Sequence, residues 1–261
     1  MNPYLIRISS QKGGVGKTTI AVNLATSLRL FNYKVLLVDG DLSNPSIGFH
    51  LGLEQANIGY SDVLNEKSTL RNSIAVHNPS GLHVLPGTIN TKSYMPTEKE
   101  METFVDELLK SDYEFVVVDT SPGYIAEEPT SHYSEALLVS TPELSACTSS
   151  IRLAHMYDKD KLKHNLLVNR VKGKRYEITI DEIEEMYEDR VVGVIPEDEV
   201  VPISVSEHIP AFLLDPRSKF SRSIESTSRK YASKSGTSYT EKTIFSRFSI
   251  IGFLKRLLGL R

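Results

Sequence analysis

A glycine-rich segment near the start of the chain carries the residues with the clearest chemistry. It reads Gln-Lys-Gly-Gly-Val-Gly-Lys-Thr-Thr. Glycine has no Cβ, so such a loop can turn several backbone N–H groups toward one anion. Lys17 is placed to reach the β- and γ-phosphates of a nucleotide, and the Thr18 hydroxyl can bind the accompanying Mg²⁺. The segment therefore predicts a P-loop for a nucleoside triphosphate, formed by Gln11, Lys12, Gly13, Gly14, Val15, Gly16, Lys17, Thr18 and Thr19.

A P-loop requires a buried strand before it and a helix after it. The apolar residues 4–9 predict the strand, and the spacing of apolar residues over 20–29 predicts the helix. The N-terminus of that helix would add a partial positive charge. Because both flanks are present, we favour a phosphate site over a glycine-rich turn without a ligand. One position departs from the pattern G-x-x-x-x-G-K-[ST], since Gln11 replaces the first glycine.

Two aspartates follow later apolar runs. Asp119 ends the run 115–119, where P-loop enzymes keep an acid of the metal site. Asp41 follows the run 34–39 and is a candidate for orienting or polarising an attacking water. Each also has a simpler interpretation, because a lone Asp at a strand end is often a helix cap and Asp-Gly-Asp is often a turn. The preceding P-loop favours the metal and water roles.

Short apolar runs alternate with helical segments along the chain. Runs without polar alternation predict strands that are covered on both faces, which is typical of a mainly parallel sheet. We therefore expect one doubly wound α/β domain, with its site at the carboxyl ends of the strands, where Asp39, Asp41, Asp119 and Asn169 fall. Further strands are predicted at residues 34–39, 82–86, 115–119, 136–140, 165–169 and 191–196, and helices at residues 99–109 and 181–187.

Composition places the chain among ordinary globular proteins. It has 261 residues, of which 40% are hydrophobic and 24% charged. Cys147 is its only cysteine, so no disulfide can form within the chain, and this favours a reducing cytoplasm. The first residues lead straight into a strand rather than a signal peptide, and no run of about 18 apolar residues predicts a membrane span.

Charge is distributed unevenly. The whole chain has 30 Lys+Arg and 33 Asp+Glu, a net charge of −3. Residues 217–261 hold 11 of the basic and 2 of the acidic residues, a net charge of +9, which leaves 19 and 31, or −12, for residues 1–216. A basic tail on an acidic body indicates an acidic partner for the tail.

The tail has two expected parts after a P-loop domain of residues 1–225. Residues 226–243 are rich in Ser, Thr, Lys and Gly and predict a flexible linker, whereas residues 244–261 predict a short amphipathic helix. Attraction to anionic lipid of ~1 kcal/mol per basic residue favours a membrane-surface anchor over a helix packed on the domain. Its membrane contacts would be Ile250, Ile251, Phe253, Leu254, Lys255, Arg256, Leu257 and Leu258.

Lys12, ahead of Gly-Gly-Val-Gly-Lys-Thr, resembles the deviant Walker A motif x-K-G-G-x-G-K-[ST] of the MinD/ParA family of ATPases. In that family the first motif position is free, and the first lysine crosses a dimer interface to the partner's nucleotide. The resemblance therefore implies a homodimer held by ATP and Mg²⁺. It also implies that Asp41, the second acid of a D-x-D motif, acts in hydrolysis. The implied catalytic set is Lys12, Lys17 and Asp41, and the implied metal set is Thr18, Asp41 and Asp119.

Later motifs follow in the family's order. Residues 169–170 are similar to its N-R pair at the adenine ring, and residues 194–198 to the I-P-E-D segment on the other side of the base. Residues 134–143 and 253–259 are similar to segments of MinD, the latter to its membrane-targeting tail, and within the family the chain resembles the archaeal type of MinD most. The second switch departs from D-[ST]-P-A-G, since this chain has Asp-Thr-Ser-Pro-Gly at residues 119–123. The implied base-binding set is Asn169, Arg170, Pro196, Glu197 and Asp198.

Together the P-loop and the tail imply a membrane switch. An ATP dimer would present two weak membrane helices, whose linkage can raise avidity by about 10² to 10⁴, and hydrolysis would release them. The resemblance implies a role in positioning a cell-division, motility or other polar structure. It also implies a cargo protein, or a partner that stimulates slow ATP hydrolysis.

Three alternatives stay open. A ParA-like partition ATPase would bind DNA nonspecifically, with the basic tail on phosphate, although the apolar face of the tail favours lipid. An iron–sulfur reductase shares the P-loop, but Cys147 alone cannot build a cluster unless a dimer axis pairs it. A nucleotide-locked adaptor would bind ATP without turning it over, which the presence of Lys12 and Asp41 disfavours.

Overall fold

The computed structural model describes residues 2–88, 96–123 and 130–234. Within them, eight strands form one sheet in the order β3-β4-β2-β5-β1-β6-β7-β8, and every pair is parallel except β3 with β4. The mainly parallel sheet predicted from the apolar runs is therefore confirmed. The strands are β1 Tyr4–Ser9, β2 Val35–Gly40, β3 Ala75–His77, β4 Leu82–Leu85, β5 Phe115–Thr120, β6 Glu135–Ser140, β7 His164–Val171 and β8 Gly193–Pro196.

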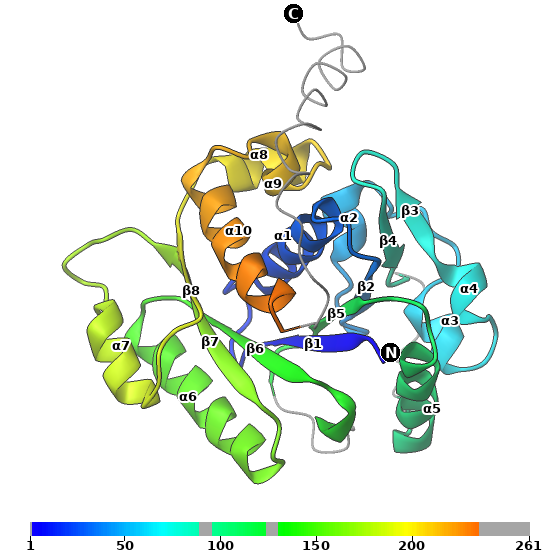
Figure 1. Cartoon of the computed structure of the whole chain (residues 1–261), viewed down its shortest axis with the longest axis horizontal. Helices are drawn as coiled ribbons and strands as arrows, with labels where there is room; N and C mark the ends of the chain where they lie inside the picture. Colours follow the sequence, from blue (N-terminus) through cyan, green and yellow to red (C-terminus); the bar gives the residue numbers. More distant parts are fainter. Residues whose placement is uncertain (1, 89–95, 124–129, 235–261) are drawn as a thin grey trace, which may run out of the picture.

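Helices cover both faces of the sheet (Figure 1). One apolar core packs α1, α2, α8, α9 and α10 against one face, and a second core packs α3 to α7 against the other. Strand residues alternate between the cores, so that Leu5 lies in one and Ile6 in the other. The helices are α1 Lys17–Leu30, α2 Ile47–Leu51, α3 Tyr60–Leu64, α4 Leu70–Ser73, α5 Glu98–Leu109, α6 Leu144–Lys159, α7 Ile180–Tyr187, α8 Val200–Ser206, α9 Ala211–Leu214 and α10 Lys219–Ala232, with a 3₁₀ turn at Thr130–His132.

The boundaries differ from the expected ones where caps decide them. Helices α5 and α7 begin at residues 98 and 180, because Thr97 and Thr179 each accept a hydrogen bond from the backbone three residues on. Helix α1 begins at residue 17 rather than 20, so that Lys17 and Thr18 belong to its first turn. Strand β3 was not expected, since its three residues form a short antiparallel edge without an apolar run.

The predicted linker is wrong over residues 226–232, which continue α10. Composition misled there because the hydroxyls are satisfied inside the helix: Thr227 Oγ1 donates to Ser223 O at 3.0 Å and Ser228 Oγ to Ile224 O at 2.8 Å. Both residues are buried, together with Tyr231. Residues 235–261, with the rest of the linker and the membrane helix, lie outside the described residues.

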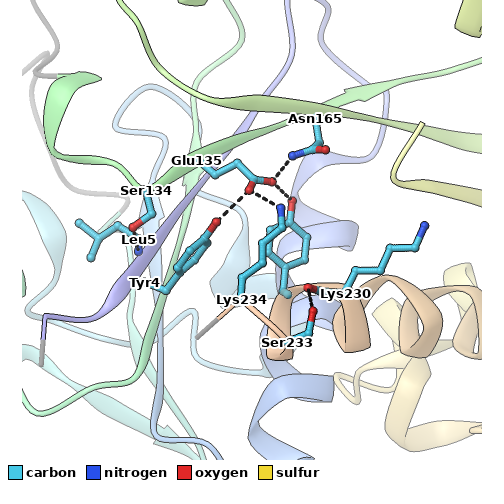
Figure 2. A network of polar contacts seen from close by, with 9 residues as sticks. Tyr4, Leu5, Ser134, Glu135, Asn165, Lys230, Ser233 and Lys234 are labelled. Carbon is cyan, nitrogen blue, oxygen red and sulfur yellow. Dashed lines mark hydrogen bonds and ion pairs between the residues drawn. The ribbon is translucent and has the colours of Figure 1, made fainter. Parts of the chain in front are cut away.

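A buried carboxylate fastens the end of α10 to the sheet (Figure 2). Glu135, 2% exposed at the start of β6, accepts hydrogen bonds from Tyr4 Oη and Tyr231 Oη, each at 2.8 Å. Lys234 Nζ lies 2.5 Å from Glu135 Oε2, and the Asn165 amide donates to Oε1. Burial, with the charge of Glu135, raises the pKa of the Tyr4 phenol well above its usual range. The last described residues are therefore held at the amino ends of β1, β6 and β7.

Candidate active site

The glycine-rich segment connects the carboxyl end of β1 to α1. Gly14 and Gly16 have φ values of 78° and 95°, in the left-handed region that glycine adopts without strain. Gly16 is the N-cap of α1 and offers no side chain, so the first-turn N–H groups remain available to an anion. Burial lowers the pKa of the Lys17 ammonium, whereas the charges of Asp119 and then Asp41 raise it. In the predicted loop Gln11, Gly13 and Gly14 are exposed, Lys12, Gly16, Thr18 and Thr19 are half-buried, and Val15 and Lys17 are buried.

Two carboxylates and a hydroxyl meet beside this loop. Asp39 and Asp119 are register partners on β2 and β5, so their side chains leave the sheet at the same level. Thr18 Oγ1 donates to Asp119 Oδ2 at 2.6 Å. Both carboxylates are buried, and Oδ1 of each has no hydrogen-bond partner among the described residues. Oxygen atoms of this kind are the ligands that Mg²⁺ prefers, so the residues fit a magnesium ion.

The charges at this point favour a cation. Burial raises the pKa of the Asp119 carboxyl to about 7, although the Thr18 hydrogen bond and the Lys17 charge lower it. Burial, and after it the charge of Asp119, raises the pKa of Asp39 to about 8. A divalent ion would stabilise both ionised forms. Within the described residues no three His, Cys, Asp or Glu side chains form a metal cage, so nucleotide phosphates would supply further ligands.

Asp39 and Ser46 belong to this site although the sequence assigned them no role. Asp39 Oδ2 accepts a hydrogen bond from the Ile47 N–H at 2.9 Å, which fixes the start of α2. Ser46 Oγ lies 2.9 Å from Thr18 Oγ1. The place of Asp39 at the end of an apolar run was the signal that could have identified it. Its pairing with Asp119, however, depends on the strand order, which the sequence does not give.

Asp41 lies on the loop that joins β2 to α2. Its Oδ1 accepts hydrogen bonds from the N–H groups of Ser43 at 3.2 Å and Asn44 at 3.0 Å, as the turn interpretation of Asp-Gly-Asp expects. The same oxygen accepts from Ser121 Oγ at 2.8 Å. Its charge also acts on Lys17 and Asp119. The charge of Asp41 therefore acts on Lys17 and Asp119 at the site. Its hydrogen bonds, in contrast, are to its own turn and to Ser121 in the loop after β5.

The segment after β5 runs along the P-loop. Thr120 Oγ1 donates to Ile8 O at 2.8 Å, and the Gly123 N–H donates to Ser10 O at 2.8 Å. Ser10 Oγ in turn donates to Lys12 O at 2.7 Å. Residues 120–123, the last ones described before residues 124–129, are thus joined to the phosphate loop through the end of β1.

Lys12 points to a neighbouring helix. Its Nζ donates to Ser145 Oγ, 2.5 Å away, in the first turn of α6. Lys12 is half-buried, whereas Ser145 is exposed and follows Leu144, whose side chain is 64% exposed. The amine of Lys12 is therefore held against α6, whereas that of Lys17 is buried at the start of α1.

The residues predicted at the base are only partly brought together. Asn169 is buried on β7 and its Nδ2 donates to Val15 O at 2.8 Å, while Arg170 is exposed with a φ of 58°. A Cβ on Gly16 would lie 2.4 Å from Asn169 Nδ2, so only glycine fits there. Beyond β7 and β8 lies a cavity of about 600 Å³, lined by Val171, Lys172, Pro196, Glu197, Asp198, Glu199, Pro202 and Lys219.

Two of the acidic residues that line this cavity, Glu197 and Asp198, already have partners. Glu197 forms an ion pair with Lys172, with Oε2 and Nζ 3.0 Å apart. Asp198 accepts from the Val200 N–H at 3.1 Å and the Phe220 N–H at 3.2 Å, so it orders α8 and α10. The structure therefore shows Pro196, Glu197 and Asp198 at one hollow, with Asn169 bound to the phosphate loop instead.

Comparison with known proteins gives one family. The CobQ/CobB/MinD/ParA nucleotide binding domain matches residues 6–211. The chain is 32% identical over 203 residues to an uncharacterized ATP-binding protein of Methanocaldococcus jannaschii, covering 76% of each chain. MinD of Pyrococcus horikoshii, solved with Mg-ADP, is 28% identical with a TM-score of 0.83, over 90% of this chain and 98% of that one.

A MinC:MinD cell division protein complex from Aquifex aeolicus is also similar, with 26% identity, a TM-score of 0.79, and coverage of 91% of this chain and 98% of that one.

Among the described residues of the present chain, no helix is both long and apolar enough to cross a membrane.

Proposed function

The chain belongs to the CobQ/CobB/MinD/ParA nucleotide-binding family, and within it we propose a MinD-type membrane switch that dimerises on binding ATP. It is an ATP hydrolase of the MinD/ParA type that binds nucleotide and Mg²⁺. We propose that ATP joins two copies, that the pair attaches to the membrane, and that hydrolysis releases it.

The observation that carries the proposal is the position of the two lysines. Lys17 is buried at the start of α1, within reach of a nucleotide held by the P-loop. The side chain of Lys12 instead extends to α6, where its amine donates a hydrogen bond to Ser145 beside the exposed Leu144. A loop with one lysine inside and one outside supports the view that Lys12 serves the nucleotide of a second copy.

Each residue then has a defined task. Backbone N–H groups of the loop and the α1 terminus bind the phosphates, and Lys17 orients them. Thr18 and Asp119 would hold Mg²⁺, with Asp39 beside them, and the ion when bound neutralises charge on the phosphates. Asp41 orients the attacking water. Pro196 and the ion pair of Lys172 with Glu197 would enclose the base.

The membrane part of the proposal depends on residues 244–261. Its apolar side chains, Ile250, Ile251, Phe253, Leu254, Leu257 and Leu258, would enter the bilayer, while Lys255 and Arg256 contact anionic headgroups. The chain leaves the described fold at Lys234, held to Glu135 at the amino ends of the strands. The P-loop follows the carboxyl end of β1. Since the tail begins at the opposite edge of the sheet, we propose that ATP acts on it through dimerisation.

We further propose that the switch positions a cell-division, motility or other polar structure at the inner face of the cell membrane. A cargo or activating protein would complete it, as the Aquifex MinD crystallised with MinC supports.

Co-sedimentation with anionic vesicles tests the membrane step. The full chain is expected to pellet with ATP and Mg²⁺ but not with ADP, and a chain ending at Lys242 is expected to stay in the supernatant with either nucleotide. A Leu254→Glu variant, which keeps the tail but breaks its apolar face, should behave like the truncated chain. Ile203→Glu is the matched control, because it makes the same kind of change at an apolar side chain of α8 that is 50% exposed, and it should pellet normally.

Pelleting that ignores the nucleotide would contradict the switch. Absence of pelleting, together with an ATP-dependent shift of nonspecific DNA, would assign the tail to DNA and the chain to a ParA-like role.

A further inference from the structure

Two loops that follow adjacent strands are joined by one side-chain hydrogen bond. Asp41 follows β2, Ser121 follows β5, and β2 pairs with β5 along its whole length. Ser121 Oγ donates to Asp41 Oδ1 at 2.8 Å, although the residues are 80 positions apart in the chain. This contact links the loop that carries the proposed water-orienting acid to the segment that follows the metal-site acid Asp119.

Asp41 uses its two oxygens differently. Oδ1 accepts three hydrogen bonds, two of them from the backbone of its own turn, at Ser43 and Asn44. Only the donor from Ser121 comes from outside the turn. Oδ2 makes no hydrogen bond with any residue that the structure describes, and the side chain is half-buried at the site. One oxygen is therefore fixed, and the other is left for a water molecule.

Ser121 stands on a segment that is itself held in place. On one side of it, Thr120 Oγ1 donates to Ile8 O at 2.8 Å on β1. On the other side, the Gly123 N–H donates to Ser10 O at 2.8 Å, just before the phosphate loop. Ser121 therefore has a fixed position relative to the phosphate loop, and its hydroxyl is the one side-chain donor to Asp41 from outside the turn among the described residues.

We infer that Ser121 is a positioning residue for ATP hydrolysis, which holds Asp41 Oδ1 so that Oδ2 faces the attacking water. The inference rests on the proposed role of Asp41. In the motif D-[ST]-P-A-G the place of Ser121 is taken by proline, which has no side-chain donor. The departure noted in the sequence thus gives this chain a contact between its two switch segments.

The reaction balances without any change at Ser121. The water oxygen forms a bond to the γ-phosphorus, and the bond from that phosphorus to the β–γ bridging oxygen breaks with its electron pair on ADP. The water proton passes to the departing phosphate. Asp41 Oδ2 accepts a hydrogen bond from the water during attack, and Ser121 keeps its proton while donating to Oδ1.

Steady-state kinetics on the full chain with Mg-ATP tests the inference. Ser121→Ala is expected to lower kcat by about tenfold, as for loss of a hydrogen bond to a charged group, with KM for ATP within about twofold. Ser121→Thr keeps the hydroxyl and should restore kcat to within about threefold of the starting value. Ser111→Ala is the matched control, because its hydroxyl donates only to Leu108 O in the turn between α5 and β5, at the amino end of β5, and it should leave kcat unchanged.

The double variant separates positioning from a general structural effect. If Ser121 acts through Asp41, Asp41→Asn/Ser121→Ala should be no slower than Asp41→Asn alone. An undiminished kcat in Ser121→Ala, or losses that multiply in the double variant, would overturn the inference. An unchanged kcat in Asp41→Asn would instead show that Asp41 is not the water-orienting acid. Should Ser121→Ala not fold, Ser121→Cys, whose thiol is a weak donor, is expected to show the same fall in kcat.

Discussion

Asp39 and Asp119 illustrate how single residues are set at this site. Each ends an apolar strand, and the register of β2 with β5 puts them at the same level in a buried place. Burial raises the pKa of both carboxyls, to about 8 for Asp39 and about 7 for Asp119; the charge of Asp119 adds to the rise at Asp39, and the charge of Asp41 adds to the rise at both. Without a cation the pair is therefore destabilising when both groups are ionised, and with Mg²⁺ it becomes a ligand set.

The metal-free, nucleotide-free protein should accordingly lose stability as pH rises. An acid whose folded-state pKa is raised binds more protons in the folded than in the unfolded state between about pH 4 and pH 8, so the free energy of unfolding falls across that window. Asp39→Asn removes the carboxyl with the higher pKa. We expect this variant to have a higher Tm than the unsubstituted chain at pH 8 in EDTA, by about 2–4 °C for each kcal/mol gained, and a smaller Tm difference between pH 6 and pH 8.

Asp215→Asn is the control, because Asp215 lies away from the site in the turn between α9 and α10, and its effect should not depend on the presence of Mg²⁺. A metal-free Asp39→Asn protein that melts below the unsubstituted chain at pH 8 would contradict the repulsion of the two carboxyls.

At the scale of elements, one buried group decides how α10 meets the sheet. Glu135 takes hydrogen bonds from β1, β7 and α10, and these partners are the hydroxyls, the amide and the ammonium seen in Figure 2. Removing Glu135 is costly because buried donors such as the Tyr231 hydroxyl lose their acceptor, whereas Lys234 is exposed and its ammonium can be solvated. The network lies at the amino ends of the strands, away from the phosphate loop.

Glu135→Ala should therefore destabilise the fold without touching the nucleotide site. We expect the free energy of unfolding to fall by roughly 1–3 kcal/mol, measured by urea unfolding, because Tyr4, Tyr231 and Asn165 lose a shared acceptor. Glu185→Ala, an exposed acid on α7, should stay within about 0.5 kcal/mol of the unsubstituted chain. The affinity of folded Glu135→Ala for ATP should be unchanged. Equal stability of the two variants would show that the network contributes nothing net.

Sequence reasoning reached the elements whose signals are local. The spacing of Gly16, Lys17 and Thr18 between a strand and a helix is complete within one stretch of chain. The Glu135 network is different, because Tyr4 and Tyr231 lie 131 and 96 positions away. The pairing of Asp39 with Asp119 likewise depends on strand order. The linker prediction failed over 226–232 because hydroxyl side chains that bond within a helix look, by composition, like a solvated chain.

At the scale of the whole molecule, the phosphate site and the start of the proposed membrane tail lie at opposite ends of the strands. The phosphate loop, Thr18 and the aspartates lie at the carboxyl ends of the strands, and α10 ends at the amino ends beside Glu135. The sheet therefore separates the phosphate loop from Lys234, the last described residue before the tail. The proposed dimer would overcome this separation, because joining two copies doubles the number of tails without moving either one.

The mass of the particle in solution tests this account most directly. With Mg²⁺ and a non-hydrolysable ATP analogue, light scattering should give about twice the 29.2 kDa of one chain, and with ADP a single chain. Lys12→Ala should remain a single chain with either nucleotide while still binding it, since Lys17 is intact. Lys159→Ala, which removes an exposed charge from the far end of α6, should dimerise normally. A Lys12→Ala protein that doubles its mass at the same concentration would contradict the account.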